Sequence, residues 1–148
     1  MSPSWKVSTR SARGTQALAR KIGASLSPGA VIALVGDLGA GKTTFVQGLA
    51  EGLGVLDPST VLSPTYTLVN EYPAQSGVLV HVDFYRLENA DAGRALGIEE
   101  QLARPDGVVA VEWAENLPEL IPEHAVWIRI ADSGGKSRDF EITGLEPT

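Results

Sequence analysis

A glycine-rich segment in the first third of the chain has the residues and spacing of a phosphate-binding loop. It reads GDLGAGKTT. In such a loop, glycines let backbone N–H groups curl around phosphate oxygens, the lysine reaches the terminal phosphates, and the hydroxyl after the lysine binds Mg²⁺. The segment therefore predicts a nucleotide site made by Gly36, Asp37, Leu38, Gly39, Ala40, Gly41, Lys42, Thr43 and Thr44.

The elements on either side of this loop are those that a phosphate site needs. The continuous apolar run 30–35, AVIALV, is typical of a strand buried on both faces of a parallel sheet. After the loop, apolar residues recur at helical spacing over 42–53, and Gly54 is placed to end that helix. A helix that starts at the loop directs the positive end of its dipole at a bound anion.

Two carboxylates are candidates to complete a magnesium site. Asp83 ends VLVHVD and Glu112 ends VVAVE, so each stands where a buried strand emerges. One of them can hold Mg²⁺ directly or through water while the other orients the attacking water or helps to hold the ion. The alternative is that one of the two only caps a helix or pairs with an arginine such as Arg86.

Buried apolar runs alternate with helical segments along the rest of the sequence. This order predicts an α/β fold of one domain over residues 1–148, with a mainly parallel central sheet flanked by helices and antiparallel edge strands. A helix is expected over 11–26 and a helical stretch over 90–102. Strands are expected over 65–72, 77–85 and 107–113. The last two strands, 125–130 and 139–142, look like an antiparallel edge hairpin.

Composition excludes several classes of function. The chain has no cysteine and two histidines, which argues against disulfides, thiol catalysis and a zinc cluster. A net charge of -6 argues against a protein that binds nucleic acid by itself. No run is long enough to span a membrane and the N-terminus lacks the apolar middle of a signal peptide, so we expect a cytoplasmic protein.

Two further segments have alternative interpretations. The hydroxyls from Ser63 to Thr67 suit a switch that senses the terminal phosphate, and they suit equally an ordinary hairpin entry with surface threonines. Trp113, next to Glu112, either packs over the nucleotide or fills the core.

Four segments in this order resemble the TsaE family, also called YjeE, of small bacterial P-loop ATPases. They are GDLGAGKTTFVQGL, SPTYTLVNEY, HVDFYRL and VEWAENLPELIP, and the resemblance runs from about Thr15 to Pro122. It implies a P-loop NTPase-like fold and an ATPase with ATP and Mg²⁺ as cofactors. It also implies a role in tRNA N6-threonylcarbamoyladenosine modification, in which ATP hydrolysis resets the TsaB–TsaD transferase complex and tRNA is contacted only through partners. We expect slow turnover by the protein alone and stimulation by a partner, because no obvious arginine finger lies among these segments.

The resemblance also implies roles for individual residues. Lys42, Asp83 and Glu112 would be the catalytic residues, with Thr43 and Glu112 as magnesium ligands and Asp83 as the Walker B acid at the same metal. Ser63 to Thr67 would form a switch-like segment. The phosphates would lie on 36–44, Trp113 would lie near the nucleotide, and the segment 9–15, including Ser11, would lie by the base.

Two other classes of enzyme use the same loop. A small-molecule kinase needs arginines for an anionic acceptor and an arginine-bearing lid, whereas the eight arginines here are scattered along the chain. A GTPase would carry an Asn-Lys-x-Asp segment that reads guanine, and the sequence has none. The small-molecule kinase is kept as the alternative function.

Overall fold

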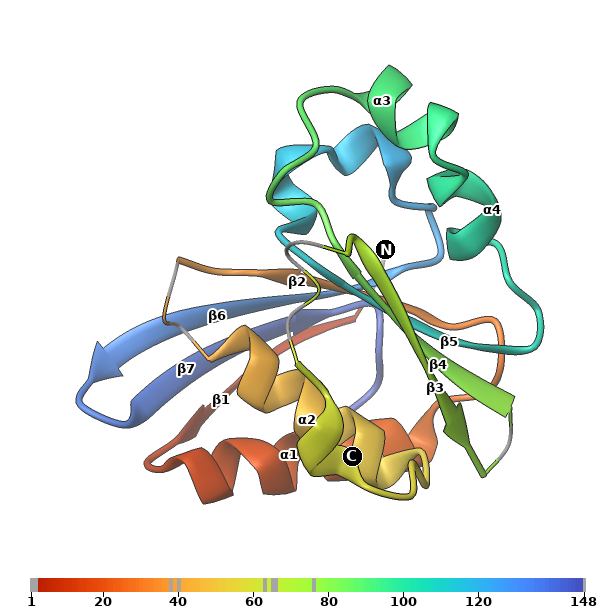
Figure 1. Ribbon diagram of the computed structural model, residues 1–148. Coiled ribbons are helices and arrows are strands. Elements are labelled where there is room, and N and C mark those ends of the chain that lie inside the picture. The colour runs from red at the N-terminus through yellow and green to blue at the C-terminus, as the bar shows by residue number, and fades with distance from the viewer. Residues whose placement is uncertain are drawn as a thin grey trace.

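A seven-stranded sheet forms the centre of the computed structural model, which describes residues 3–37, 39, 41–62, 64, 67–75 and 77–147 (Figure 1). Its spatial order is β1-β7-β6-β2-β5-β4-β3. The strands are β1 (Ser4–Thr9), β2 (Val31–Val35), β3 (Val69–Ala74), β4 (Gly77–Asp83), β5 (Gly107–Glu112), β6 (Val126–Gly134) and β7 (Ser137–Thr143).

The strand directions divide the sheet into a parallel centre and antiparallel edges. β2 pairs in parallel with both β5 and β6, and β5 pairs in parallel with β4. Outside this group, β3 runs antiparallel to β4, β7 runs antiparallel to β6, and β1 runs antiparallel to β7. The predicted α/β fold with a parallel centre and antiparallel edges is therefore confirmed.

Helices cover the two faces of this sheet (Figure 1). One face carries α1 (Ala12–Ser25) and α2 (Lys42–Gly52), and the other carries α3 (Ala90–Ala95), α4 (Ile98–Leu102) and two 3-10 helices, η2 (Ala114–Asn116) and η3 (Pro118–Leu120). A further 3-10 helix, η1 (Pro58–Thr60), follows α2. The central strands are buried because they lie between these layers.

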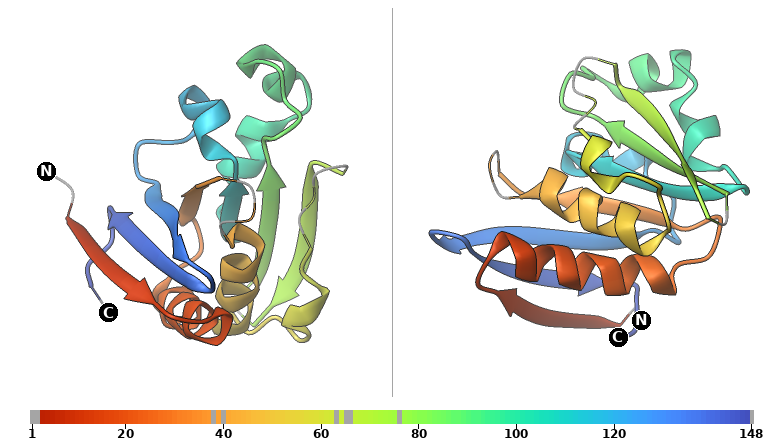
Figure 2. Two further views of the ribbon diagram at one scale, coloured as in Figure 1. Left: turned by 90° about the vertical axis from the view of Figure 1, so that its left-hand side faces the viewer. Right: turned by 60° about the horizontal axis from the view of Figure 1, so that its bottom comes forward.

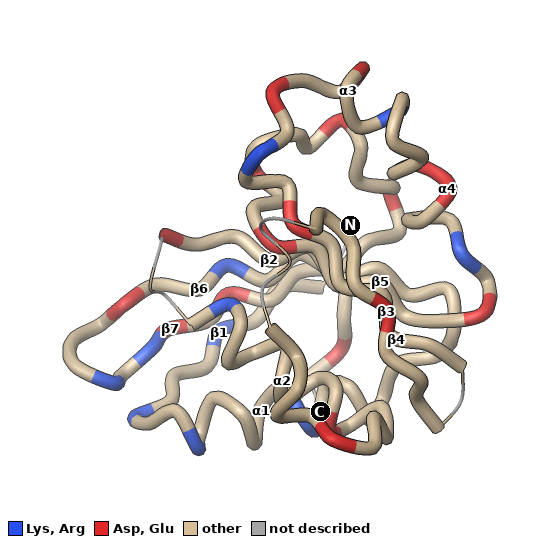
Figure 3. The backbone as a smooth tube through the Cα atoms, in the orientation of Figure 1, with Lys and Arg blue, Asp and Glu red and all other residues tan. Residues whose placement is uncertain are grey.

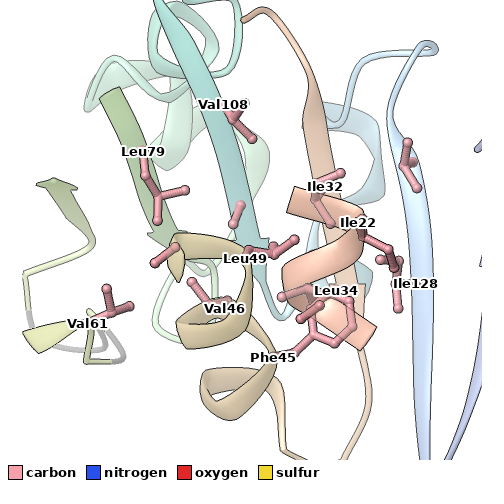
Figure 4. Close-up of a cluster of buried hydrophobic side chains, with 14 of the residues drawn as sticks. Ile22, Ile32, Leu34, Phe45, Val46, Leu49, Val61, Leu79, Val108 and Ile128 are labelled. Carbon is pink, nitrogen blue, oxygen red and sulfur yellow. The ribbon is translucent and has the colours of Figure 1, made fainter. Parts of the chain in front are cut away.

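The two faces of β2 separate into two hydrophobic clusters, as alternation along a strand requires. Ile32 and Leu34 pack with Phe45 of α2 in the cluster drawn in Figure 4. Val31, Ala33 and Val35 face the opposite cluster, which includes residues of α4 and η3. All of β2 is thereby removed from water, which explains its uninterrupted apolar sequence.

Helix α2 is held against α1 by a close approach at a glycine. A Cβ atom added to Gly48 would lie 2.6 Å from the Cβ atom of Ala19, a distance that real side chains do not tolerate. The two helices lie side by side across one face of the sheet in the right-hand view of Figure 2. This packing fixes the position of α2 and of the loop that precedes it.

The structure corrects one of the sequence expectations. The hairpin β6–β7 is not at the edge, because the N-terminal segment Ser4–Thr9 forms β1 and pairs along β7. The turn-rich helical patch expected around 90–102 consists of two helices, α3 and α4, and Gly97 lies between them with φ 77°. That left-handed conformation suits glycine and ends α3.

Charge is unevenly distributed over the fold (Figure 3). Lysines and arginines are frequent along α1 and along the hairpin β6–β7, where acidic residues accompany them, whereas aspartates and glutamates predominate around α3 and α4. Within the described ranges, no helix combines the length and apolar character needed to cross a membrane.

Candidate functional site

The glycine-rich loop lies between the end of β2 and the start of α2, as the sequence predicted. Gly41 is the N-cap of α2 with φ 101°, a left-handed conformation, and the first helical hydrogen bond joins Phe45 N–H to the Gly41 carbonyl at 2.9 Å. The free N–H groups of the first turn therefore point into the loop, where an anion would be stabilised. Leu38 and Ala40 of the predicted phosphate site lie outside the described residues.

Lys42 is buried at the base of this loop, with 5% of its surface exposed. Its Nζ donates hydrogen bonds to the carbonyls of Gly36 and Asp37, the latter at 3.1 Å, and lies 3.9 Å from the centre of the Trp113 ring. Burial lowers the pKa of Lys42, because the ammonium loses solvation. Four carboxylates oppose that decrease in pKa: Glu115, Glu112, Asp83 and Asp37.

Thr43, the residue after the lysine, faces the carboxylate of Glu112. Thr43 Oγ1 lies 3.4 and 3.5 Å from the two carboxylate oxygens, and only 3% of Glu112 is exposed. Glu112 Oε2 also lies 2.5 Å from Nε2 of His81, which is fully buried on β4. The structure therefore brings the first turn of α2 and the end of β5 together through side chains.

Asp83 ends the neighbouring strand β4 and pairs in register with Glu112. It is 2% exposed, and its Oδ1 accepts a hydrogen bond from the Tyr85 N–H at 2.7 Å. Its own N–H donates to the Leu68 carbonyl at 3.0 Å, and Leu68 has φ 70°. Both predicted acids thus lie at the same edge of the sheet, beside the loop.

Trp113 follows Glu112 in the left-handed conformation, with φ 58°. An aromatic residue in this conformation is strained, and such strain gathers at functional sites. The Trp113 ring packs against the Tyr85 ring at a tilt of 50°, with 5.0 Å between ring centroids, and it also contacts Lys42 Nζ. The structure therefore places Trp113 at the loop rather than deep in the core, where it remains partly exposed.

The start of α1 and the hairpin β6–β7 border the loop from the other side. A pocket of about 140 Å³ is lined by Ala12, Thr15, Gly39, Gly41, Thr44, Lys136 and Arg138. The Ser11 side chain caps α1 by accepting a hydrogen bond from the Gly14 N–H at 3.0 Å. From the segment 9–15, Ala12 and Thr15 line the pocket. Contact of Ser11 with a base stays a prediction.

The switch-like segment is described only in part. Ser63, Thr65 and Tyr66 lie outside the described residues, and Thr67 Oγ1 donates to Asn70 Oδ1 at 2.9 Å. The role of this segment stays a prediction.

The oxygen donors at the loop have the chemistry that magnesium prefers. The Thr43 hydroxyl and the carboxylates of Glu112 and Asp83 are hard oxygen ligands. No cluster of three or more His, Cys, Asp or Glu residues suited to a metal occurs in the part of the chain that the structure describes. In proteins Mg²⁺ is usually held by one or two carboxylates together with substrate phosphates and water.

Three contributors to the site were not predicted from the sequence. Glu115 Oε2 accepts from the Gly36 N–H at 3.3 Å, and the Arg138 guanidinium donates to the Gly39 carbonyl at 3.4 Å from the distant hairpin. No local pattern marks these two residues. His81 could have been identified from the sequence, because it lies two residues before Asp83 on the same strand and therefore on the same face of the sheet.

Comparison with known proteins gives consistent results. The family described as threonylcarbamoyl adenosine biosynthesis protein TsaE matches residues 9–140. The TsaE protein of Bacillus subtilis (strain 168) is 41% identical over 131 residues, which cover 88% of this chain and 80% of that protein. The TsaE protein of Aquifex aeolicus (strain VF5) is 46% identical over 110 residues, covering 74% and 77% of the two chains.

A solved structure extends the similarity to three dimensions. The crystal structure of YdiB from Bacillus subtilis superimposes with a TM-score of 0.78 at 34% sequence identity, covering 99% of this chain and 88% of the other. The chain therefore belongs to the TsaE family of threonylcarbamoyl adenosine biosynthesis proteins.

Proposed function

We propose that the chain is a Mg²⁺-dependent ATPase that acts in the biosynthesis of tRNA threonylcarbamoyladenosine. Membership of the TsaE family supports the biosynthetic role. The observation that carries the ATPase proposal is the contact of Thr43 with Glu112, at 3.4 Å, directly after a buried Lys42 at the start of α2. Lysine, hydroxyl and carboxylate are the groups that a Mg²⁺-nucleotide site requires.

Lys42 supplies the positive charge for the terminal phosphates. Its Nζ contacts two backbone carbonyls, which are weaker acceptors for an ammonium than ionised phosphate oxygens. We propose that phosphate oxygens replace these carbonyls as ATP binds. Burial of Lys42 favours this exchange, because a buried cation is stabilised most by an anion.

Thr43 and Glu112 are the proposed ligands of the metal, and Asp83 is the proposed Walker B acid beside them. Mg²⁺, when bound, would offset the charge of the phosphate groups. We propose that Asp83, whose carboxylate accepts a hydrogen bond from the Tyr85 N–H, also accepts one from the attacking water. The first turn of α2 adds backbone N–H groups to the same anion.

The proposed partner is the TsaB–TsaD complex, which hydrolysis would reset between catalytic cycles. Tyr85 is 53% exposed, and its ring packs at a tilt against Trp113, which in turn contacts Lys42. A partner that covers Tyr85 would therefore act on the site through two aromatic rings. The net charge of -6 supports contact with tRNA only through partners, and we place this activity in the cytoplasm.

ATP hydrolysis by the purified protein, measured with and without TsaB–TsaD complex and tRNA, tests the proposal. A parallel pull-down in ATP and in ADP measures the association, and Lys42→Ala serves as the inactive control. We expect slow turnover alone, faster turnover with the complex, and association that depends on the nucleotide. Robust turnover with no association would contradict the partner role and would favour a small-molecule kinase.

A further inference from the structure

His81 is a polar side chain at a position where the strand pattern calls for an apolar one. Alternate residues of β4 share a face, so Leu79, His81 and Asp83 point to the side that carries α1 and α2. Leu79 belongs to the hydrophobic cluster there, and Asp83 lies at the site. His81 stands between them and is fully buried.

The neighbouring strand leaves room for this imidazole and directs it to Glu112. The residue paired with His81 is Ala110, whose small side chain leaves space beside the ring. Glu112, two residues further along β5, shares that face, and its Oε2 lies 2.5 Å from His81 Nε2. Because an ionised carboxylate only accepts, Nε2 is the donor in this hydrogen bond.

The histidine has no comparable hydrogen bond elsewhere in the described part of the chain. Its Nδ1 is buried and without a hydrogen-bond partner there. An unpaired buried polar atom disfavours folding, and an apolar side chain of similar size would avoid it. The hydrogen bond to Glu112 is therefore the contact that a histidine supplies at this position and a leucine does not.

We infer that His81 is a positioning residue that orients the carboxylate of Glu112 for Mg²⁺. The hydrogen bond at Oε2 fixes the rotation of the carboxylate, and that orientation faces the hydroxyl of Thr43 at 3.4 to 3.5 Å. Outer partners that hold a metal-binding side chain in this way typically contribute about 10–100-fold to metal affinity or activity. This inference rests on the proposed Mg²⁺-ATP site.

The test is a titration of Mg²⁺ at fixed ATP, with ATP binding measured at equilibrium. His81→Leu keeps bulk but removes the donor, and His81→Gln places an amide donor near the position of Nε2. The control is His124→Leu, because His124 is exposed and its ring contacts the Gly29 carbonyl, away from Glu112. Thermal unfolding of each variant reports on the fold.

We expect His81→Leu to raise the Mg²⁺ concentration for half-maximal ATP binding by about 10–100-fold. ATP binding measured in EDTA should not change, the melting temperature should not fall, and His81→Gln should restore most of the Mg²⁺ dependence. If His81→Leu does not fold, His81→Asn takes its place, because the shorter side chain cannot reach Glu112.

Three outcomes would overturn the inference. Equal Mg²⁺ requirements in the wild type and His81→Leu would show that His81 does not position the ligand. If His81→Leu lost the same ATP affinity in Mg²⁺ as in EDTA and had a lower melting temperature, His81 would have a structural role. If Mg²⁺ did not change ATP binding by the wild type, the proposed function would be overturned as well. The wild-type measurement therefore distinguishes a failure of the proposed function from a failure of the role of His81.

Discussion

The strands β4 and β5 end side by side in carboxylates, but these two carboxylates have different partners. Asp83 and Glu112 pair in register and are almost equally buried, at 2% and 3% exposure. Glu112 contacts the side chains of Thr43 and His81. Asp83 accepts a hydrogen bond from the backbone of the turn that follows its own strand, at Tyr85.

This difference shows that a strand-end position does not decide the role of an acid. Glutamate is one methylene longer than aspartate, and Glu112 reaches across to the first turn of α2. Asp83, the shorter acid, accepts a hydrogen bond within the turn that follows β4 and lies at the same end of the sheet. We therefore assign the metal contact first to Glu112 and the orientation of water first to Asp83.

The largest effect is expected from removal of the Lys42 ammonium, which lies near both acids. Lys42→Ala should lower ATP hydrolysis by at least about 100-fold, because it removes the buried ammonium that is proposed to contact the phosphates. Steady-state phosphate release measures this effect, and Lys21→Ala, an exposed lysine of α1, is the matched control. Turnover of Lys42→Ala at the wild-type rate would contradict the site itself.

Glu112→Gln tests the first half of the comparison. Hydrolysis should fall by about 100-fold and the Mg²⁺ requirement should rise, since the loss of a ligand should cost at least as much as the loss of an outer partner. Phosphate release measured over a range of Mg²⁺ concentrations checks both effects. An unchanged Mg²⁺ requirement would remove Glu112 from the metal.

Asp83→Asn tests the second half. The amide oxygen can still accept from the Tyr85 N–H, so the turn should persist. Hydrolysis should fall by about 10-fold, at the lower end of the range for supporting groups, with little change in the Mg²⁺ requirement. If Asp83→Asn raised that requirement more than Glu112→Gln did, the two assignments would have to be exchanged.

The smallest expected effect concerns the residue after Glu112. Trp113→Ala removes the ring that contacts Lys42 and Tyr85, and it should lower the free energy of unfolding by about 1 kcal/mol. Trp113→Phe, which keeps an aromatic ring, should lose less. Urea unfolding measures both variants, and equal stability of wild type and Trp113→Ala would show that this packing does not hold the end of β5.

The part of this site that could be predicted from the sequence depends on local patterns. The order of β2, loop and α2 follows from a buried apolar run, a glycine pattern and helical spacing, all within 30–53. The positions of both acids follow from the ends of parallel strands. Their different partners do not, because Thr43 is 69 residues from Glu112 in sequence and the packing of α2 decides that contact.

Long-range pairing also accounts for what was missed in the fold. β1 pairs with β7 across almost the whole chain, Ser4 with Thr143, and no local signal reports such a partner. Arg138 reaches Gly39 only because the hairpin β6–β7 extends beside the loop.

The most direct test of the account is equilibrium binding of ATP to the wild-type protein and to Glu112→Gln and Asp83→Asn, each with Mg²⁺ and with EDTA. We predict that Mg²⁺ tightens ATP binding to the wild type and to Asp83→Asn, and that Glu112→Gln loses most of this gain. Equal binding with Mg²⁺ and with EDTA in all three proteins would contradict a Mg²⁺-ATP site at the ends of β4 and β5.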